Sequence, residues 1–227
     1  MKKPLATFTK AVLATVVAST ISAGAFAFTT GGSSSRTDKM ILGDSIFALS
    51  GDIHSNLERN LGENIDTYAQ SGCQMNGTSF ICGERGRIPN QYKSANKNGI
   101  NTVIFNGGGN DFLLGDGGDC RNQACIEEVL AAIEQTISGL VSDMKRDGIS
   151  EIVYLGYYNT PSDPDNVAIN GLSMAYKAAN YPAMGVKFVD TRNSFAGNER
   201  SYIKSDGIHP TAAGSRVLAD LIEAALD

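Results

Sequence analysis

Histidine and tryptophan are scarce in this sequence, which argues against several kinds of site. The chain of 227 residues has two histidines, His54 and His209, and no tryptophan. It has four cysteines but no Cys-x-x-Cys pair, which disfavours a zinc site. The motifs Gly-x-Ser-x-Gly, His-Glu-x-x-His and Gly-x-x-x-x-Gly-Lys-[Ser/Thr] are also missing. The sequence therefore gives no sign of a nucleophile elbow of that type, a zinc protease or a phosphate-binding P-loop.

No acidic residue precedes Asp38, and the stretch before it has the composition of an export signal. It begins with the basic residues Lys2, Lys3 and Lys10 and continues with a mostly apolar run at 11–18. It ends with the small-x-small pattern Ala25-Phe26-Ala27. The apolar run is shorter than the ~20 residues that a membrane-spanning helix needs. The pattern predicts a signal peptide at 1–27 rather than an ordinary N-terminal helix. Because the first cysteine is Cys73, no thiol near the cleavage site can carry a lipoprotein anchor, and we expect a periplasmic or secreted protein.

Removing 27 of the 227 residues leaves 200, enough for one domain with a substantial core. The predicted signal contains three of the 19 basic side chains and none of the 24 acidic ones. The remaining 200 residues therefore have 16 basic and 24 acidic side chains, a formal charge of −8. Such an acidic surface disfavours nucleic acid and anionic lipid as partners, and we expect no stable membrane insertion. Residues 28–37 are small and polar, which predicts a flexible lead-in. A single domain at 38–227, expected to be a monomer, follows.

The four cysteines predict two disulfides, because their number is even and the chain is expected to be exported. They are Cys73, Cys82, Cys120 and Cys125. Three pairings are open from the sequence. The local one, which joins each cysteine to its nearest neighbour, demands least of the fold.

Apolar runs and helical spacing alternate along the chain. Strands are predicted at 38–43, 64–70, 101–108, 151–158 and 186–191, and helices at 45–61, 126–146, 168–180 and 211–226. Several strands are continuously apolar, as expected when both faces of a sheet are covered. This pattern predicts an α/β fold with a five-stranded parallel sheet between helical layers. In such sheets, functional groups gather at the carboxyl ends of the strands.

Four short stretches fall at or near those carboxyl ends. They contain Ser45 in "GDSIF", Gly72 in "AQSGC", Asn110 in "NGGGND", and Asp206 with His209 in "SDGIHP". Each has a structural interpretation when it is taken alone. Ser45 suits a helix N-cap, the glycines and Asn110 suit turns, and His209 suits a helix entry. Those interpretations do not explain why all four stretches are expected at the same edge of the sheet.

Acyl transfer needs this set of groups. A serine hydroxyl becomes a nucleophile when a histidine takes its proton, and a carboxylate on the far ring nitrogen fixes the tautomer. Asp206 lies three residues before His209 and can reach it within one turn. The backbone N–H groups of Ser45 and Gly72 and the amide of Asn110 are the candidate oxyanion donors. On one continuous helix His54 would lie roughly 13 Å from Ser45, too far to serve it.

In these residues the chain resembles the SGNH/GDSL hydrolases, with their signature Ser, Gly, Asn and His at 45, 72, 110 and 209 in the family order. The resemblance implies a flavodoxin-like α/β/α sandwich, no metal or cofactor, and ester hydrolysis through an acyl-serine. It assigns the triad to Ser45, Asp206 and His209. Ile46 stands where the family usually has leucine, and the family does not require the cysteine pair that follows Gly72.

The aromatic residues near these strand ends are Phe112, Tyr157 and Tyr158. We expect them to line the substrate pocket, although a place in the core or at the rim suits them nearly as well. With no long apolar lid and no tryptophan, the sequence favours short-acyl or sugar-acetyl esters. The alternatives are an O-acyltransferase acting on a glycan, a long-chain lipase or lysophospholipase, and a non-catalytic carbohydrate-binding module. The run "GDGGD" lacks a complete calcium-ligand pattern and is interpreted as a solvated turn.

Overall fold

A computed structural model describes residues 37–160 and 164–226. The strands are β1 (Lys39–Leu42), β2 (Asp66–Thr67), β3 (Thr102–Phe105), β4 (Glu151–Leu155) and β5 (Lys187–Val189). The α-helices are α1 (Ser45–Ala48), α2 (Asp52–Leu61), α3 (Ile88–Ser94), α4 (Gly109–Leu113), α5 (Gln123–Arg146), α6 (Pro164–Asn180), α7 (Arg192–Phe195), α8 (Glu199–Tyr202) and α9 (Ala212–Glu223). Three short 3₁₀ helices complete the described elements: η1 (Glu84–Gly86), η2 (Asp116–Asp119) and η3 (Pro182–Met184). The signal peptide predicted at 1–27 and nearly all of the lead-in lie outside the described residues.

The five strands form one parallel sheet in the order β2-β1-β3-β4-β5. This confirms the predicted fold class, and the order is that of flavodoxin-like sheets. From β1 the chain passes to one side for β2 and to the other for β3, so a topological switch point lies between β1 and β3. Leu42 pairs with Phe105, and Phe105 pairs with Tyr154. The segments that follow these three strands therefore leave the sheet side by side.

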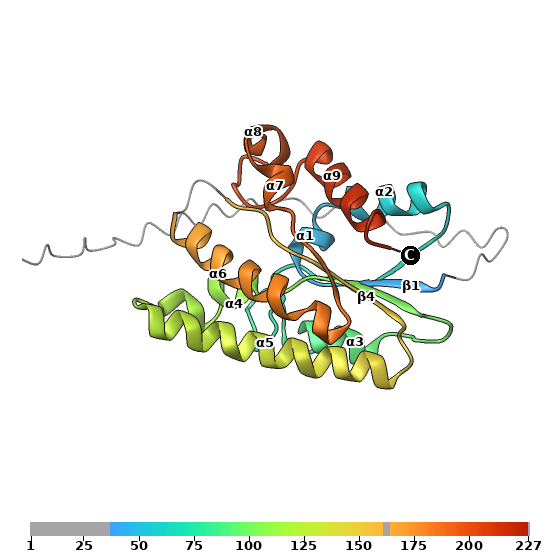
Figure 1. Ribbon diagram of the computed structural model, residues 1–227, viewed down its shortest axis with the longest axis horizontal. Coiled ribbons are helices and arrows are strands. Elements are labelled where there is room, and N and C mark those ends of the chain that lie inside the picture. The colour runs from blue at the N-terminus through green and yellow to red at the C-terminus, as the bar shows by residue number, and fades with distance from the viewer. Residues whose placement is uncertain (1–36, 161–163, 227) are drawn as a thin grey trace, which may run out of the picture. The chain divides into compact units, whose positions relative to one another are not determined.

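Alternate residues of the strands enter two separate cores, because successive side chains of a strand point to opposite faces. In β3, Val103 and Phe105 belong to one core and Ile104 to the other. Helices α3 and α5 supply side chains to the first core, and α1, α2, α7 and α9 supply the second. Figure 1 shows these groups of helices on opposite sides of the sheet. The molecule is a three-layer α/β/α sandwich, as expected.

The helix predicted at 45–61 is divided in two. It stops after α1 and restarts at α2, and Gly51 between them has a positive φ of 45°. A glycine adopts this conformation without the steric cost that a side chain would bring. His54 consequently lies on α2, and the prediction that it shares one straight helix with Ser45 was wrong.

Two stretches for which neither strand nor helix was predicted contain short helices. η1 and α3 lie within residues 71–98, and α4 and η2 lie within 109–125. The second strand is shorter than predicted, with two residues in place of seven. The disulfides follow the local pairing, Cys73 with Cys82 and Cys120 with Cys125. Each bond closes a loop that flanks the carboxyl edge of the sheet. Among the described helices, none has the length and hydrophobicity needed to cross a membrane.

Candidate active site

The turn between β1 and α1 places Ser45 at the first residue of a helix. Asp44, not Ser45, is the N-cap, since its side chain accepts a hydrogen bond from the N–H of Ile46 at 2.9 Å. The interpretation of Ser45 as a helix cap was therefore wrong. Gly43 precedes the cap with φ +146°, and a Cβ at this position would lie 1.9 Å from Oδ1 of Asn106. Only glycine fits this turn.

A side chain from a distant helix also holds this turn. Gln91 of α3 is 1% exposed, and its side-chain amide both accepts a hydrogen bond from the backbone of Gly43 and donates one to it. Its Oε1 accepts from the Gly43 N–H at 2.8 Å, and its Nε2 donates to the Gly43 carbonyl at 2.9 Å. The backbone immediately before Asp44 and Ser45 is thus fixed by a buried pair of hydrogen bonds.

Asp44 is the centre of a buried network beside Ser45. It is 2% exposed, and its carboxylate accepts from Nδ2 of Asn106 at 2.8 Å and from the hydroxyl of Tyr157 at 2.5 Å. Burial raises the pKa of Asp44, while the bonds from Tyr157, Ile46 and Asn106 and the nearby His209 oppose the rise. Burial also raises the pKa of Tyr157 well above its usual range, so its hydroxyl remains a donor. The network links the ends of β1, β3 and β4.

The turn "SDGIHP" holds its histidine by the ring nitrogen that faces Asp206. Nδ1 of His209 lies 2.8 Å from Oδ2 of Asp206. The other carboxylate oxygen accepts the backbone N–H groups of Ile208 and His209, each at 2.9 Å. Burial alone would raise the pKa of Asp206, but these hydrogen bonds hold it below its usual value. Asp206 is therefore an ionised acceptor at neutral pH, which favours a proton on Nδ1 of the ring.

The second ring nitrogen of His209 is both enclosed and unused. Nε2 is buried and makes no hydrogen bond to any residue within 37–160 or 164–226. With the proton on Nδ1, Nε2 carries a free lone pair. A buried lone pair without a partner costs free energy, and a catalytic role is one reason why a protein retains such a group. This atom is the basic group that the sequence analysis assigned to Ser45.

Tyr158 joins the histidine turn to the end of β4. Its hydroxyl donates to the carbonyl of Ile208 at 2.5 Å, and its ring stacks on Phe195 with centroids 4.1 Å apart. Burial raises the pKa of Tyr158, so the donor stays protonated. Because Ile208 and Ser45 line the same cavity, the turn that carries His209 and the helix that carries Ser45 meet at one edge of the sheet.

The two other predicted oxyanion residues lie close together. Asn110 in α4 is 6% exposed and donates one amide hydrogen to the carbonyl of Cys73 at 3.0 Å. Its second amide hydrogen is available to another acceptor. Gly72, the neighbour of Cys73, has φ +73°, and a Cβ there would lie 2.8 Å from that of Ile81. The tight fit of the disulfide loop around Gly72 excludes a side chain.

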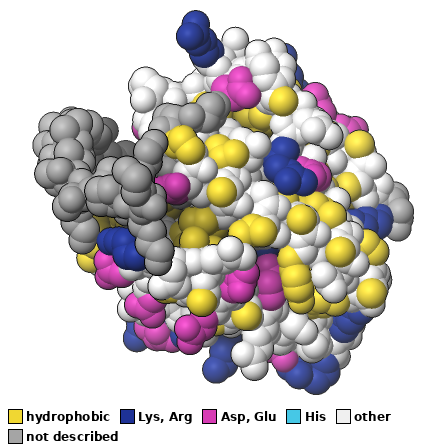
Figure 2. All heavy atoms as spheres, turned by 60° about the vertical axis from the view of Figure 1, so that its left-hand side comes forward, with side chains coloured by type: hydrophobic (Ala, Val, Ile, Leu, Met, Phe, Trp, Pro, Cys, Tyr) yellow, Lys and Arg dark blue, Asp and Glu magenta, His cyan; other side chains and the backbone are white. Residues whose placement is uncertain are grey.

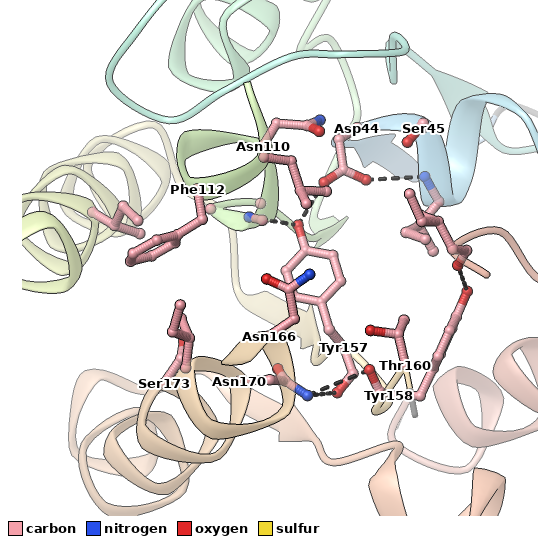
Figure 3. A pocket seen from close by; sticks show the side chains of 18 of the residues that line it. Asp44, Ser45, Asn110, Phe112, Tyr157, Tyr158, Thr160, Asn166, Asn170 and Ser173 are labelled. Atoms are coloured by element: carbon pink, nitrogen blue, oxygen red, sulfur yellow. Dashed lines mark hydrogen bonds between the residues drawn. The ribbon is translucent and has the colours of Figure 1, made fainter. Parts of the chain in front are cut away.

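A cavity of about 120 Å³, which we call the Ser45 pocket, opens at this edge. Its wall includes Ser45, Asn110 and all three aromatic residues expected there, Phe112, Tyr157 and Tyr158. Gly72, Asp206 and His209 are not part of the wall. Figure 3 shows Tyr157 rising through the middle of the pocket toward Asp44, with Phe112 on one side and Tyr158 on the other. Figure 2 shows the face at the carboxyl ends of the strands, where hydrophobic side chains gather between polar ones.

His54 has a structural place instead. Its Nε2 lies 2.7 Å from the carbonyl of Ile65 and 3.3 Å from the carboxylate of Glu58. Within the described part of the chain, no group of three His, Cys, Asp or Glu side chains is arranged to hold a metal ion. The acidic run in η2 is exposed at Asp116 and Asp119, and Asp119 pairs with Arg121 at 3.6 Å.

Sequence reasoning missed the supporting residues around Ser45. Asp44 and Asn106 stand inside the motifs quoted above, and Tyr157 was assigned to the pocket without a role in holding Asp44. No local pattern indicates that these three side chains meet. Their contact depends on the pairing of β1, β3 and β4.

A flavodoxin-like sheet with Ser45 and the His209 turn at its carboxyl edge is the arrangement of the SGNH/GDSL hydrolases. The chain belongs to the GDSL-like lipase/acylhydrolase family, whose model matches residues 41–217. The match begins in β1 and ends in α9, so it covers every candidate site residue and all of the sheet except Lys39 and Met40. No curated protein sequence matches the chain.

Solved structures with the same fold include a lipase and an esterase. The lipase Lip_vut3 from a goat rumen metagenome has 18% identity and a TM-score of 0.65, with 82% of this chain and 96% of that one covered. TesA has 18% identity and a TM-score of 0.62, with 83% and 97% covered. The psychrotrophic esterase EstA from Pseudoalteromonas sp. has 11% identity and a TM-score of 0.55, with 83% and 96% covered. At these identities the likeness establishes the fold.

Proposed function

We propose that this protein is an exported serine esterase that hydrolyses carboxylic esters through an acyl-serine. Ser45 is the nucleophile, His209 the general base and Asp206 the carboxylate that orients it. The observation that carries the proposal is the state of the His209 ring. One nitrogen is held by Asp206, and the other is buried without a partner, in a turn that shares a cavity with Ser45.

The reaction follows from the proton positions. Nε2 of His209 accepts the proton of Ser45 as the hydroxyl oxygen attacks the ester carbonyl, and the ionised Asp206 stabilises the imidazolium that forms. When the tetrahedral intermediate collapses, the C–O bond to the alcohol breaks and Nε2 returns the proton to the leaving oxygen. A water molecule then repeats both steps on the acyl-serine, which releases the acid and restores Ser45.

We assign three donors to the negative oxygen of the intermediate. They are the N–H of Ser45, at the unsatisfied N-terminus of α1, the N–H of Gly72, and the free amide hydrogen of Asn110. The hydrogen bond from Asn110 to Cys73 holds that amide in place before substrate arrives. Removing one such donor typically costs about 3–4 kcal/mol of transition-state stabilisation.

The Ser45 pocket supports short-acyl esters, sugar acetates among them, as substrates. Its volume of about 120 Å³ is small, and Phe112, Leu113, Leu130 and Ile133 give it an apolar wall from α4 and α5. An apolar wall binds a hydrocarbon group, and a small volume limits its length.

We expect hydrolysis of p-nitrophenyl esters to be fastest with acetyl to butanoyl groups and to fall steadily toward palmitoyl. The alcohol is constant in this series, so kcat/KM reports the fit of the acyl group alone. Highest kcat/KM on the longest chains would contradict the short-acyl proposal, although not the esterase itself.

Two local disulfides among the described residues fit an oxidising compartment and support export. Expression in a bacterial host should yield a protein outside the cytoplasm whose sequence begins at Phe28, as read by N-terminal sequencing. An intact Met1 on the exported protein would argue against the cleavage site.

A further inference from the structure

A second hollow, open to solvent, adjoins the Ser45 pocket between α5 and α6. Its volume is about 450 Å³, and we call it the α5–α6 groove. Its apolar walls come from Leu130, Ala131, Leu172 and Tyr176. Figure 1 shows α5 and α6 running along the same side of the sheet.

Leu130 and Ser173 line both cavities. On α5, Ile133 faces the Ser45 pocket and Ala131 faces the groove, while Leu130 borders both. On α6, Ser173 likewise borders both cavities, while Asn170 lines only the Ser45 pocket and Tyr176 only the groove. Because residues three and four apart share one side of a helix, each helix presents a continuous stripe from one cavity to the other. Leu130 and Ser173 are the wall between the cavities.

A buried ion pair between the helices fixes this wall. Nζ of Lys177 is bonded to the Glu134 carboxylate and donates to Oγ of Ser173 at 2.7 Å. The Glu134 carboxylate also accepts from the hydroxyl of Tyr181 at 2.9 Å. The Lys177 side chain is 1% exposed and that of Glu134 9% exposed. The two charges neutralise each other, and the other acidic residue of the groove, Glu127, accepts a hydrogen bond from Gln123.

The reaction chemistry indicates which half of the ester points toward this wall. Nε2 of His209 must return a proton to the leaving alcohol, so the alcohol lies on the side of the His209 turn. The acyl group then extends away from that turn, past Asn110 and Phe112, toward Ser173. Figure 3 shows Phe112 and Ser173 on the side of the pocket opposite Tyr158, which holds the His209 turn.

We propose that Leu130 and Ser173 set the acyl-length limit of the enzyme, and that the α5–α6 groove is an acyl-chain site closed off by these two side chains. The occupant that it fits is the distal part of a medium-length acyl chain. This inference rests on the proposed esterase function and assigns Leu130 as a specificity-determining residue. The groove gives a longer chain space that the 120 Å³ pocket lacks.

The test is Leu130→Ala in the full-length protein, assayed as kcat/KM on p-nitrophenyl acetate through palmitate. Each methylene that enters the groove should raise kcat/KM roughly fourfold. We therefore expect the octanoate-to-acetate ratio of kcat/KM to rise at least tenfold over that of the wild type. Leu221→Ala, which truncates a half-buried leucine of α9 in the opposite layer, is the matched control, and its ratio should stay at the wild-type value.

A second variant keeps the test sharp. Ala131 lines the groove but not the Ser45 pocket. In Leu130→Ala/Ala131→Phe the added ring fills the groove, and the gain on octanoate should be lost. The proposal would be overturned by an unchanged octanoate-to-acetate ratio of kcat/KM in folded Leu130→Ala, or by a raised ratio that persists in Leu130→Ala/Ala131→Phe. It would also be overturned if Leu130→Ala raised kcat/KM on acetates of long alcohols instead, because the alcohol and not the acyl group would then enter the groove. If the wild type hydrolyses no ester, the esterase proposal itself has failed.

Discussion

Ser45→Ala should reduce kcat on p-nitrophenyl acetate by on the order of 10⁶-fold, to the level of residual binding effects. The hydroxyl oxygen of Ser45 forms the bond to the acyl group, and the methyl side chain of alanine has no nucleophilic atom. The fold should survive the change, because Asp44 rather than Ser45 caps α1. The unfolding temperature should therefore stay close to that of the wild type. A fluorophosphonate probe should label the wild type and leave the variant unlabelled.

The chain offers a competing serine, which makes the labelling experiment decisive. Ser173 also lines the Ser45 pocket, and its hydroxyl contacts the amine of Lys177. Serine–lysine pairs act as nucleophile and base in some hydrolases. Burial lowers the pKa of Lys177 and its bond to the Glu134 carboxylate opposes that shift, while Nζ donates a hydrogen bond to Oγ of Ser173 rather than accepting the Ser173 proton. Peptide mapping of the labelled wild type should identify Ser45, and a label on Ser173 would transfer the nucleophile to α6.

Exposed Ser55 on α2 provides the control for a serine substitution without a role at the pocket. Ser55→Ala removes a hydroxyl that bonds the carbonyl of Gly51, and it should retain wild-type kcat and full labelling. If Ser45→Ala keeps turnover while Ser55→Ala also keeps it, the esterase reaction does not pass through Ser45.

The sheet could be predicted from the sequence because its signals are local. Strands β1, β3 and β4 are apolar runs, and α5 and α9 carry apolar residues at helical spacing. Helices α3 and α4 were missed because they lack such a repeat. α3 begins with Ile88-Pro89 and holds a buried Gln91, whose partner is Gly43. Gln91 is buried because it contacts a turn that is distant in the sequence, so it does not fit a hydrophobic repeat. A helix of this kind cannot be recognised from the spacing of its apolar residues.

The candidate site divides in the same way. Ser45, Gly72, Asn110 and the Asp206–His209 pair stand in short motifs that could be placed, from the sequence, at three strand ends and one helix entry. The contacts of Asp44 with Asn106 and Tyr157 could not, because the partners lie 62 and 113 residues apart in the chain. The α5–α6 groove could not be predicted either, since it depends on the packing of two helices that a buried ion pair joins.

His209→Ala and Asp206→Asn should both lower kcat, and the histidine change should cost more. Loss of the general base removes proton transfer altogether, with an expected decrease on the order of 10⁶-fold. Asp206 transfers no proton and acts by orienting the ring. Its replacement should cost on the order of 10⁴-fold, with KM changed little. The measurement is kcat and KM on one ester for the two variants and the wild type.

The structure gives the reason for the effect of Asp206→Asn. Oδ1 of Asp206 accepts two backbone N–H groups, and Oδ2 faces Nδ1 of His209. In the asparagine variant the carbonyl oxygen should keep the backbone bonds, so the NH₂ group turns toward Nδ1. A donor at that position forces the proton onto Nε2, and the ring then has no lone pair for Ser45. The geometry of the turn is preserved while the tautomer is reversed.

The second histidine of the chain is the matched control for this experiment. His54→Ala removes the contacts with Ile65 and Glu58 and should lower the free energy of unfolding by about 1 kcal/mol. It should leave kcat within twofold of the wild type, because His54 lies on α2 and not on the His209 turn. A silent Asp206→Asn would mean that another acceptor orients the ring. A silent His209→Ala would remove the general base from the mechanism, and with it the role inferred from the buried Nε2.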